Sequence, residues 1–283
     1  MKVLTTLLLA LVFVCVPILS VFSEEPQKAE EAKVTGSGAL AVYNQYVFRG
    51  YEIGKSGLVI QPSLTASYRG FSASFWGNMD TNQRSTKTAD FSSESADHKK
   101  GWNETDLTLS YTYPIGKLSV TGGYIYYNTK YALETEEIFV TAALDIIGKP
   151  SLSVYRDIAN YPGTYLNLSF AHSIPVVKEI TLDLGASFGY FAGADNYWKT
   201  YETSTGSYTG GKYKGLHDGM VKAGLTVPVT KSLVIQPVVQ YWFPLSKKAK
   251  REYANGTDID DSYNPNGPVK KNFVYGVGIA YNF

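Results

Sequence analysis

The last eleven residues of the chain alternate between apolar and mostly small side chains without interruption. One set of alternate positions holds Phe273, Tyr275, Val277, Ile279, Tyr281 and Phe283. The other set holds Val274, Gly276, Gly278, Ala280 and Asn282. Successive side chains of a β-strand point to opposite faces, so this period of two predicts a strand with one wholly apolar face. A strand at the end of a soluble chain usually frays or continues into a polar tail, whereas this one ends on Phe283.

The same alternation recurs from residue 38 onward, where the chain divides into twelve segments. Clear examples are 58–68, 71–79, 106–113, 180–190 and 233–243. A face of small polar residues behind an apolar face is typical of a membrane barrel with a polar interior. Soluble sandwiches alternate too, but their polar faces look at bulk water and carry more Lys and Glu. Beyond residue 22 no run approaches the length of an apolar transmembrane helix, which excludes a helical membrane protein.

Short and long connections alternate strictly between these segments. Short turns with Pro, Gly or Lys are expected at 69–70, 114–117, 148–150, 175–178 and 228–231. Long connections are expected at 51–57, 80–101, 128–135, 158–163, 192–215 and 244–270. Outer-membrane barrels combine short periplasmic turns with longer extracellular loops, so the pattern predicts an all-β fold, a transmembrane antiparallel up-and-down β-barrel of twelve strands. Pro62 and Pro237 each lack a ladder donor, so a bulge or local break is expected at both.

The N-terminal region has the features of a cleaved secretory signal peptide over residues 1–23. Lys2 precedes the apolar run 3–22, and 21–23 offers residues that suit a signal peptidase. The alternative is a retained membrane helix, since about 20 apolar residues span a bilayer. Residues 24–37 are charged and lack aromatics, so a flexible periplasmic leader is expected before a barrel over residues 38–283. The expected location is the bacterial outer membrane.

Charge and cysteine content exclude two further classes of function. The formal net charge is +1, and removal of Lys2 with the signal peptide takes it to 0, which argues against a nucleic-acid partner. Cys15 is the one cysteine in the sequence and lies within the expected signal peptide. A mature chain without it has no disulfide and no thiol chemistry.

The alternate positions of the predicted strands that face the lumen hold a set of polar and aromatic side chains. They are Arg49, Gln61, Trp76, Asn78, Glu104, Asp106, Glu137, Asp157, Asp183, Asp218, Lys222, Gln236, Gln240 and Trp242, with Asp145 as a further acid. The carboxylates outnumber Arg49 and Lys222, and carboxylates that line a channel raise the local concentration of cations. A preference for cations is therefore expected. The alternative is a nonselective pore, in which basic side chains neutralise several of these acids.

Catalytic and metal sites find little support in the sequence. A barrel that hydrolyses lipids needs an outward Ser and His near the extracellular rim. Of His98, His172 and His217, only His217 is expected at the level of the extracellular rim, and no outward Ser accompanies it. The acids at 252, 258, 260 and 261 lack the Gly and final Glu of an EF-hand. The chain is not expected to be an enzyme, and no metal or cofactor is expected.

Several short motifs occur along the predicted strands. They are Tyr46-Val47-Phe48-Arg49-Gly50 at the end of a first strand, the run Gly70-Phe71-x-Ala73-x-x-Trp76-Gly77, Glu136-Glu137 at the start of a later strand, and Gly163-Thr164-Tyr165-Leu166 after Tyr155-Arg156-Asp157. Together these motifs resemble those of the TorF-type porin family. The resemblance spans much of the mature chain. It implies an outer-membrane barrel with a channel role, and it supplies no substrate and no binding residues.

The predicted function is that of a porin-like channel for passive diffusion of small polar solutes. The alternative is a narrow or plugged barrel with a structural or surface-interaction role through its long loops. A barrel of twelve strands is intermediate in width between barrels of about eight strands, which side chains fill, and barrels of about sixteen or more, which enclose an aqueous channel. Expected partners are outer-membrane lipid and the barrel assembly machinery, which would read the terminal Tyr281 and Phe283. A basic run near an outer rim could hold lipopolysaccharide phosphates or form a solvated loop tip, and it consists of Lys247, Lys248, Lys250 and Arg251.

Overall fold

The computed structural model describes residues 33–54, 57–83, 99–130, 132–201, 207–250 and 269–283. The expected signal peptide, residues 24–32 of the expected leader, His98, Arg251 and the acids at 252, 258, 260 and 261 lie outside these residues. The first strand begins at Thr35, so it includes the last three residues that the sequence assigned to the leader.

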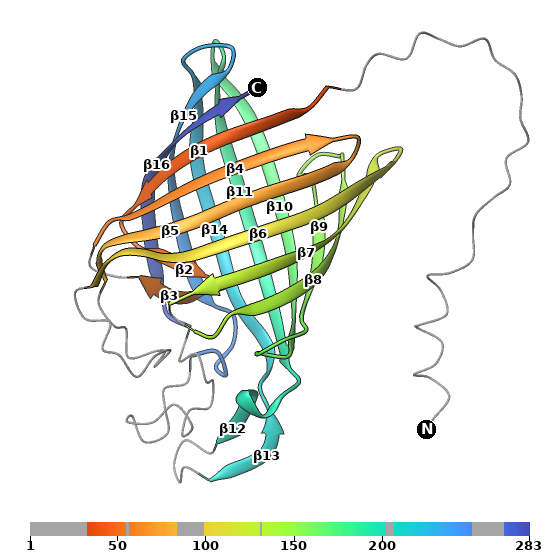
Figure 1. The fold of residues 1–283 in the computed structure, drawn as a ribbon, viewed down its shortest axis with the longest axis vertical. Coiled ribbons are helices and arrows are strands. Elements are labelled where there is room, and N and C mark those ends of the chain that lie inside the picture. Colours follow the sequence, from red (N-terminus) through yellow and green to blue (C-terminus); the bar gives the residue numbers. More distant parts are fainter. Residues whose placement is uncertain (1–32, 55–56, 84–98, 131, 202–206, 251–268) are drawn as a thin grey trace, which may run out of the picture. The chain divides into compact units, whose positions relative to one another are not determined.

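Twelve antiparallel strands close into one barrel, which confirms the predicted fold (Figure 1). Around the barrel they follow the order β1-β16-β15-β14-β11-β10-β9-β8-β7-β6-β5-β4, so the first and last strands pair and close the sheet. Their bounds are β1 Thr35–Tyr43, β4 Val59–Tyr68, β5 Phe71–Gln83, β6 Lys99–Ile115, β7 Leu118–Thr129, β8 Thr135–Leu144, β9 Ser151–Asp157, β10 Gly163–Val177, β11 Ile180–Gly193, β14 Lys214–Pro228, β15 Leu233–Pro244 and β16 Asn272–Asn282. A closed sheet has no free edge, so its backbone groups are paired without water.

Two small sheets and one short helix belong to the longer connections. Strands β2 (Tyr46–Phe48) and β3 (Tyr51–Gly54) form a hairpin between β1 and β4. Strands β12 (Lys199–Tyr201) and β13 (Tyr208–Lys212) form another between β11 and β14, after the 3-10 helix η1 (Asn196–Trp198). No helix in the described ranges is long and apolar enough to cross a membrane.

All five predicted short turns join neighbouring strands at one end of the barrel. Strands β4 and β5 meet at Arg69 and Gly70, whose φ angles are 49° and 86°. Positive φ at both central residues is the type I′ turn that favours tight hairpins. The other four turns join β6 to β7, β8 to β9, β10 to β11 and β14 to β15. The longer connections therefore lie at the other end, and β1 begins and β16 ends on the side of the short turns.

Apolar side chains occupy the outward positions of the strands, as the alternation predicts. On β16 the side chains of Phe273, Tyr275, Val277, Ile279 and Tyr281 are 42–56% exposed. Large exposed apolar residues also occur on β1, β4 to β6, β8 to β11, β14 and β15. A continuous apolar surface of this kind is rare on soluble monomers, and it matches the lipid-facing band of a membrane barrel.

Pro62 and Pro237 interrupt the ladder on one side only. Pro62 pairs with Leu40 on β1, but positions 61 and 62 have no ladder partner on β5. Pro237 pairs with Val277 on β16, but positions 236 and 237 have no ladder partner on β14. The expected local breaks are confirmed, and neither proline shifts the register of its neighbours, because the missing N–H affects one ladder alone.

The first barrel strand is shorter than predicted. Strand β1 ends at Tyr43, and the motif 46–50 that was expected at its end belongs to the separate β2–β3 hairpin. The connection between the first two barrel strands therefore covers 44–58 instead of 51–57. The reason is local, because Arg49 and Gly50 form a turn of their own.

Two β-bulges turn consecutive polar side chains to the inside of the barrel. Asn103 of β6 has no ladder partner on β5, so Asn103 and Glu104 are both buried. On β14, His217 and Asp218 together oppose Gly189 of β11, and both are 0% exposed. A bulge places two residues of one strand opposite one residue of its neighbour, which changes the direction of a side chain. Both bulges lie toward the end of the barrel that carries the long connections.

Candidate functional site

The β2–β3 hairpin crosses the interior of the barrel. It follows β1, and the guanidinium carbon of Arg49 at its tip lies 4.9 Å from the ring centroid of Tyr155 on β9. In the strand order, five strands separate β1 from β9 in either direction, so these two strands stand on opposite sides of the barrel. The hairpin therefore spans the lumen from one wall to the other.

A two-residue turn shapes the tip of this hairpin. Arg49 and Gly50 have φ angles of 48° and 81°, which is again a type I′ turn. A Cβ atom on Gly50 would lie 2.7 Å from Cβ of Asp218 and 2.8 Å from Cγ1 of Val269. Glycine is thus required here both for its backbone conformation and for close approach to the barrel wall.

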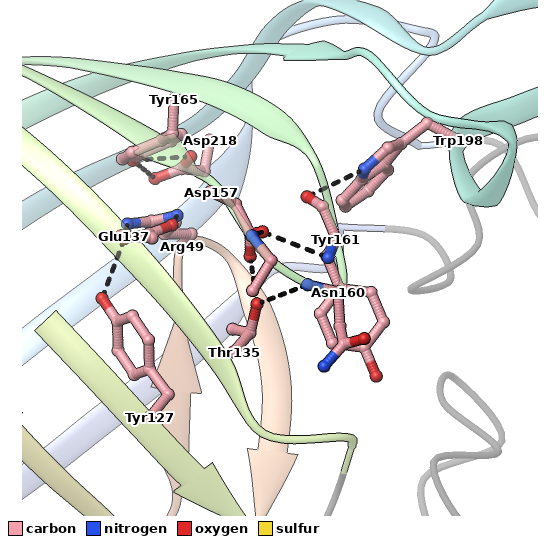
Figure 2. A network of polar contacts seen from close by, with 11 residues as sticks. Arg49, Tyr127, Thr135, Glu137, Asp157, Asn160, Tyr161, Tyr165, Trp198 and Asp218 are labelled. Atoms are coloured by element: carbon pink, nitrogen blue, oxygen red, sulfur yellow. Dashed lines mark hydrogen bonds and ion pairs between the residues drawn. The ribbon is translucent and has the colours of Figure 1, made fainter.

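One carboxylate and three aromatic rings hold the Arg49 side chain. Its Nη1 and Nη2 donate to Oε1 and Oε2 of Glu137 on β8, each at 2.7 Å (Figure 2). The rings around its guanidinium, at 4.5–4.9 Å, are those of Phe48, Tyr155 and Tyr165. Burial opposes the charge, but the attraction and hydrogen bonds of Glu137 outweigh burial, so the pKa of Arg49 lies above its ordinary value. The hairpin tip therefore carries a fixed positive charge that is already paired.

A second polar group on the wall lies beside the hairpin tip. The hydroxyl of Tyr165 donates to the carboxylate of Asp218, with distances of 3.0 and 3.2 Å to its two oxygens (Figure 2). A Cβ on Gly189 would lie 2.2 Å from Oδ1 of Asp218, so this glycine leaves room for the carboxylate. His217 shares a 2.6 Å hydrogen bond between its Nδ1 and the Tyr213 hydroxyl. His217 thus lies inside the barrel, away from the outer face where a lipid hydrolase would need it.

Asp157 organises the connection between β9 and β10. Its Oδ1 accepts from the backbone N–H groups of Ala159 and Tyr161 at 3.0 and 3.1 Å. Its Oδ2 accepts from the Thr135 hydroxyl at 2.7 Å, and Trp198 Nε1 donates to the Tyr161 carbonyl at 3.4 Å (Figure 2). Most of the hydrogen-bonding capacity of this carboxylate is therefore used within the wall.

Glu104 and Asp106 leave carboxylate oxygens without a partner. Oε1 of Glu104 accepts from the Tyr46 hydroxyl at 3.4 Å, whereas its Oε2 has no hydrogen-bond partner among the described residues. The same holds for Oδ1 of Asp106. Asp145 was predicted to face the lumen, and this is wrong: β8 ends at Leu144, so Asp145 is exposed in the turn to β9.

The predicted lumen residues divide between two cavities. Arg49, Glu104, Glu137 and Asp157 line a cavity of about 140 Å³. Gln61, Trp76, Asp183, Lys222, Gln236 and Gln240 line another of about 350 Å³. Asn78, Asp106, Asp218 and Trp242 are outside both linings, and Trp242 donates to Oε1 of Gln240 at 2.9 Å.

The larger cavity has a carboxylate that is well supplied with hydroxyl donors. Asp183 accepts from Ser173 at 2.6 Å and Thr181 at 3.3 Å through Oδ1, and from Thr226 at 2.6 Å through Oδ2. Lys222 lies two residue pairs away on the neighbouring strand β14, since Gly185 pairs with Lys222 and Asp183 with Gly224. The charges of Asp183 and Lys222 therefore attract one another between these two neighbouring strands.

The sequence alone did not reveal that the hairpin folds into the lumen. A signal for the hairpin itself was present, because Arg49-Gly50 stands between Tyr46-Val47-Phe48 and Tyr51-Glu52-Ile53. An X-Gly pair between two short apolar segments is typical of a tight hairpin. Nothing local indicates that its partner is Glu137, which is 88 residues away.

The fold has counterparts among solved structures, although no family model and no curated protein matches the chain. The KdgM porin matches with a TM-score of 0.50 and 13% identity, over 87% of this chain and 99% of that one. The NanC porin matches with a TM-score of 0.49 and 8% identity, over 89% and 100%. An outer membrane channel from Pseudomonas putida F1 matches with a TM-score of 0.48 and 11% identity, over 92% and 100%. The resemblance to the TorF-type family is not confirmed by these matches, and what the chain shares with the KdgM porin is its fold.

Proposed function

We propose that the chain is a bacterial outer-membrane channel for the passive diffusion of small polar solutes. The observation that carries the proposal is a closed barrel with an apolar outer surface and charged side chains inside it. A lipid-facing apolar band around a polar lumen is the arrangement of outer-membrane channels. The neighbour with the TM-score of 0.50 is named a porin, which agrees with this proposal.

The hairpin sets the expected size of the solutes. It reaches from β1 to the opposite wall, and Arg49 is bonded to that wall through Glu137. Cavities of about 140 and about 350 Å³ lie along the lumen. A twelve-stranded barrel is intermediate between filled and open barrels, and an infolded hairpin narrows it further. We expect passage of inorganic ions and small polar molecules and exclusion of larger solutes.

The balance of charges favours cations. Arg49 is paired with Glu137, and Lys222 lies near Asp183, so these two cations offset two of the acids. Glu104 and Asp106 keep oxygens without a partner among the described residues. Uncompensated carboxylates in a narrow, low-dielectric passage raise the local concentration of cations.

The second candidate function is a filled barrel with a structural role or a role in surface interactions. The anchoring of the hairpin supports it, because Arg49 is fixed at its tip and Tyr51 packs against His217 with ring centroids 4.9 Å apart. A hairpin that never leaves this position would close the lumen to solutes and ions.

Reconstitution into planar lipid bilayers separates the two candidates. A channel gives discrete conductance steps, and a KCl gradient gives a reversal potential of the sign for potassium permeation. An anion-selective reversal potential would overturn the cation preference and leave the channel intact. Complete absence of conductance from protein that shows heat-modifiable migration on gels would support the filled barrel.

Location and assembly are part of the same proposal. We expect export through the signal peptide 1–23, insertion by the barrel assembly machinery and residence in the outer membrane. The exposed side chains of Lys247, Lys248 and Lys250 follow β15 on the side of the long connections. We propose that they contact lipopolysaccharide phosphates, which is the outer-leaflet partner that their charge fits.

A further inference from the structure

The 140 Å³ cavity lies between the hairpin and the opposite wall, and aromatic rings make up much of its lining. Tyr46, Phe48 and Tyr51 contribute from the hairpin, and Tyr127, Tyr161 and Trp198 from the wall and its connections. An apolar cavity of roughly 150 Å³ accepts a molecule as large as benzene. The cavity is therefore large enough for a compact organic molecule of about six or seven heavy atoms.

A buried carboxylate without full compensation lies in this lining. Glu104 is 8% exposed, and its Oε2 has no hydrogen-bond partner among the described residues. Asp106, two residues along the same strand and outside this lining, also has an oxygen without a partner among the described residues. Burial of an ionised carboxylate is costly unless a cation or hydrogen-bond donors compensate it.

The cation already present does not serve this carboxylate. Arg49 is the one cationic side chain among the described residues of the lining, and both of its hydrogen-bonded nitrogens donate to Glu137. The remaining charged groups of the lining are Glu104 and Asp157, which are both acids. The lining thus holds three acids against one cation, and Glu104 is the acid in it that has a carboxylate oxygen without a partner among the described residues.

We infer that this cavity binds a small organic cation of the alkylammonium class, with its charge at Glu104 and its apolar surface against the aromatic rings. Aromatic faces attract quaternary ammonium groups through cation–π interactions, and the attraction grows when the site is desolvated. Tyr46 and Tyr127 both line the cavity with Glu104: the Tyr46 hydroxyl donates to Glu104, and Tyr127 lies on β7, the strand that pairs with β6. The inference names a solute class for the proposed channel and in that respect rests on it, whereas binding itself does not require conduction.

A divalent metal ion fits the cavity less well. Calcium and magnesium require six or more oxygen ligands, and the lining is mostly aromatic. Within the described part of the chain no group of three or more His, Cys, Asp or Glu side chains is arranged to hold a metal. An ammonium ion with methyl groups instead uses both features of the site, its single free carboxylate oxygen and its rings.

Calorimetric titration of the purified full-length barrel in detergent with choline tests the inference. Its neutral analogue, 3,3-dimethylbutanol, has nearly the same shape and lacks the charge. We expect saturable binding of choline that is at least about tenfold tighter than binding of the analogue or of potassium. Equal affinity for choline and the analogue, or for choline and potassium, or no detectable binding of choline, would overturn the inference. These comparisons use the unmodified protein and need no variant to fold.

Variants then locate the bound charge and the rings. Glu104→Gln should weaken choline binding about tenfold, while Glu136→Gln, which removes an acid on the outward face of β8, should leave it unchanged. Tyr46→Phe keeps the ring and should retain binding, whereas Tyr46→Leu should weaken it several-fold. Wild-type affinity in Glu104→Gln would refute this site. Conductance of the same preparation is measured separately: ion conduction without choline binding refutes this inference alone, and choline binding without conduction refutes the channel alone.

Discussion

Arg49 at the tip of the β2–β3 hairpin donates two hydrogen bonds of 2.7 Å to Glu137 on β8. The hairpin starts from β1 and crosses the barrel lumen to reach this wall. The hydroxyl of Tyr127 donates to the same carboxylate at 2.9 Å. A bidentate pair of this kind fixes orientation as well as distance, because the planar guanidinium matches the carboxylate. This contact, together with the rings around Arg49 and the packing of Tyr51 against His217, holds the hairpin against the wall that it reaches.

Arg49→Gln should loosen the hairpin. Removal of one partner from a buried ion pair costs about 3–5 kcal/mol, since the remaining charge of Glu137 stays buried without compensation. We expect larger and noisier single-channel conductance, with the barrel still heat-modifiable on gels. Glu136→Gln, on the outward face of the same strand, is the matched control and should behave as wild type. Unchanged conductance and noise in Arg49→Gln would show that the hairpin does not limit passage.

Gly189→Ala should destabilise the bulge on β14. The added Cβ would lie 2.2 Å from Oδ1 of Asp218 and 2.6 Å from the Tyr165 hydroxyl. Overpacking of this kind costs about 1–3 kcal/mol. The urea midpoint of unfolding in lipid vesicles measures the loss. Gly122→Ala on β7, where a Cβ meets nothing within 4 Å, is the control and should change the midpoint little.

Val277→Arg and Gly278→Arg should differ in their effect on stability. Val277 is 42% exposed on the apolar outer face, and Gly278 lines the larger cavity. An arginine that faces lipid near the bilayer midplane costs about 2–4 kcal/mol, whereas one in a polar lumen keeps its hydration. The two variants are compared by unfolding in vesicles and by heat-modifiability on gels. Equal losses would contradict the register of β16.

Deletion of Phe283 should impair assembly in the outer membrane. Its backbone N–H and C=O pair with Gly36 at 3.0 and 2.9 Å, so the residue belongs to the seam where the barrel closes. Its side chain also completes the outward aromatic face of the last strand. We expect a strong fall in the amount of surface-exposed barrel, measured by protease accessibility in whole cells. A deletion of equal or greater length within residues 24–32 should have little effect, and normal surface levels without Phe283 would argue against an assembly signal.

Asp106→Asn combined with Asp183→Asn should reduce the cation preference. Asp106 has an oxygen without a partner among the described residues, and Asp183 lines the larger cavity. Loss of two negative charges lowers the local cation concentration, so the reversal potential in a KCl gradient should move toward zero. The effect should shrink at high salt, where the Debye length falls to about 3 Å at 1 M. Asp145→Asn, in an exposed turn, is the control, and a shift as large in this variant would exclude a lumen effect.

Local regularities of the sequence determined the barrel. The period of two fixes which side chains of each strand face lipid, and the positions of Pro, Gly and Lys fix where the strands reverse. The fold class, the twelve strands and the five short turns follow from these signals, and the structure confirms them. Asp145 was misplaced because alternation alone does not show that β8 ends one residue earlier.

Tertiary structure alone decided how the lumen is filled. The pairing of Arg49 with Glu137, and of Tyr165 with Asp218, joins residues 88 and 53 positions apart. The bulges that turn Asn103 and His217 inward depend on the register between neighbouring strands. A strand pattern is set by each residue and its immediate neighbours, whereas these contacts exist only after the sheet has closed and brought opposite walls within reach of one hairpin.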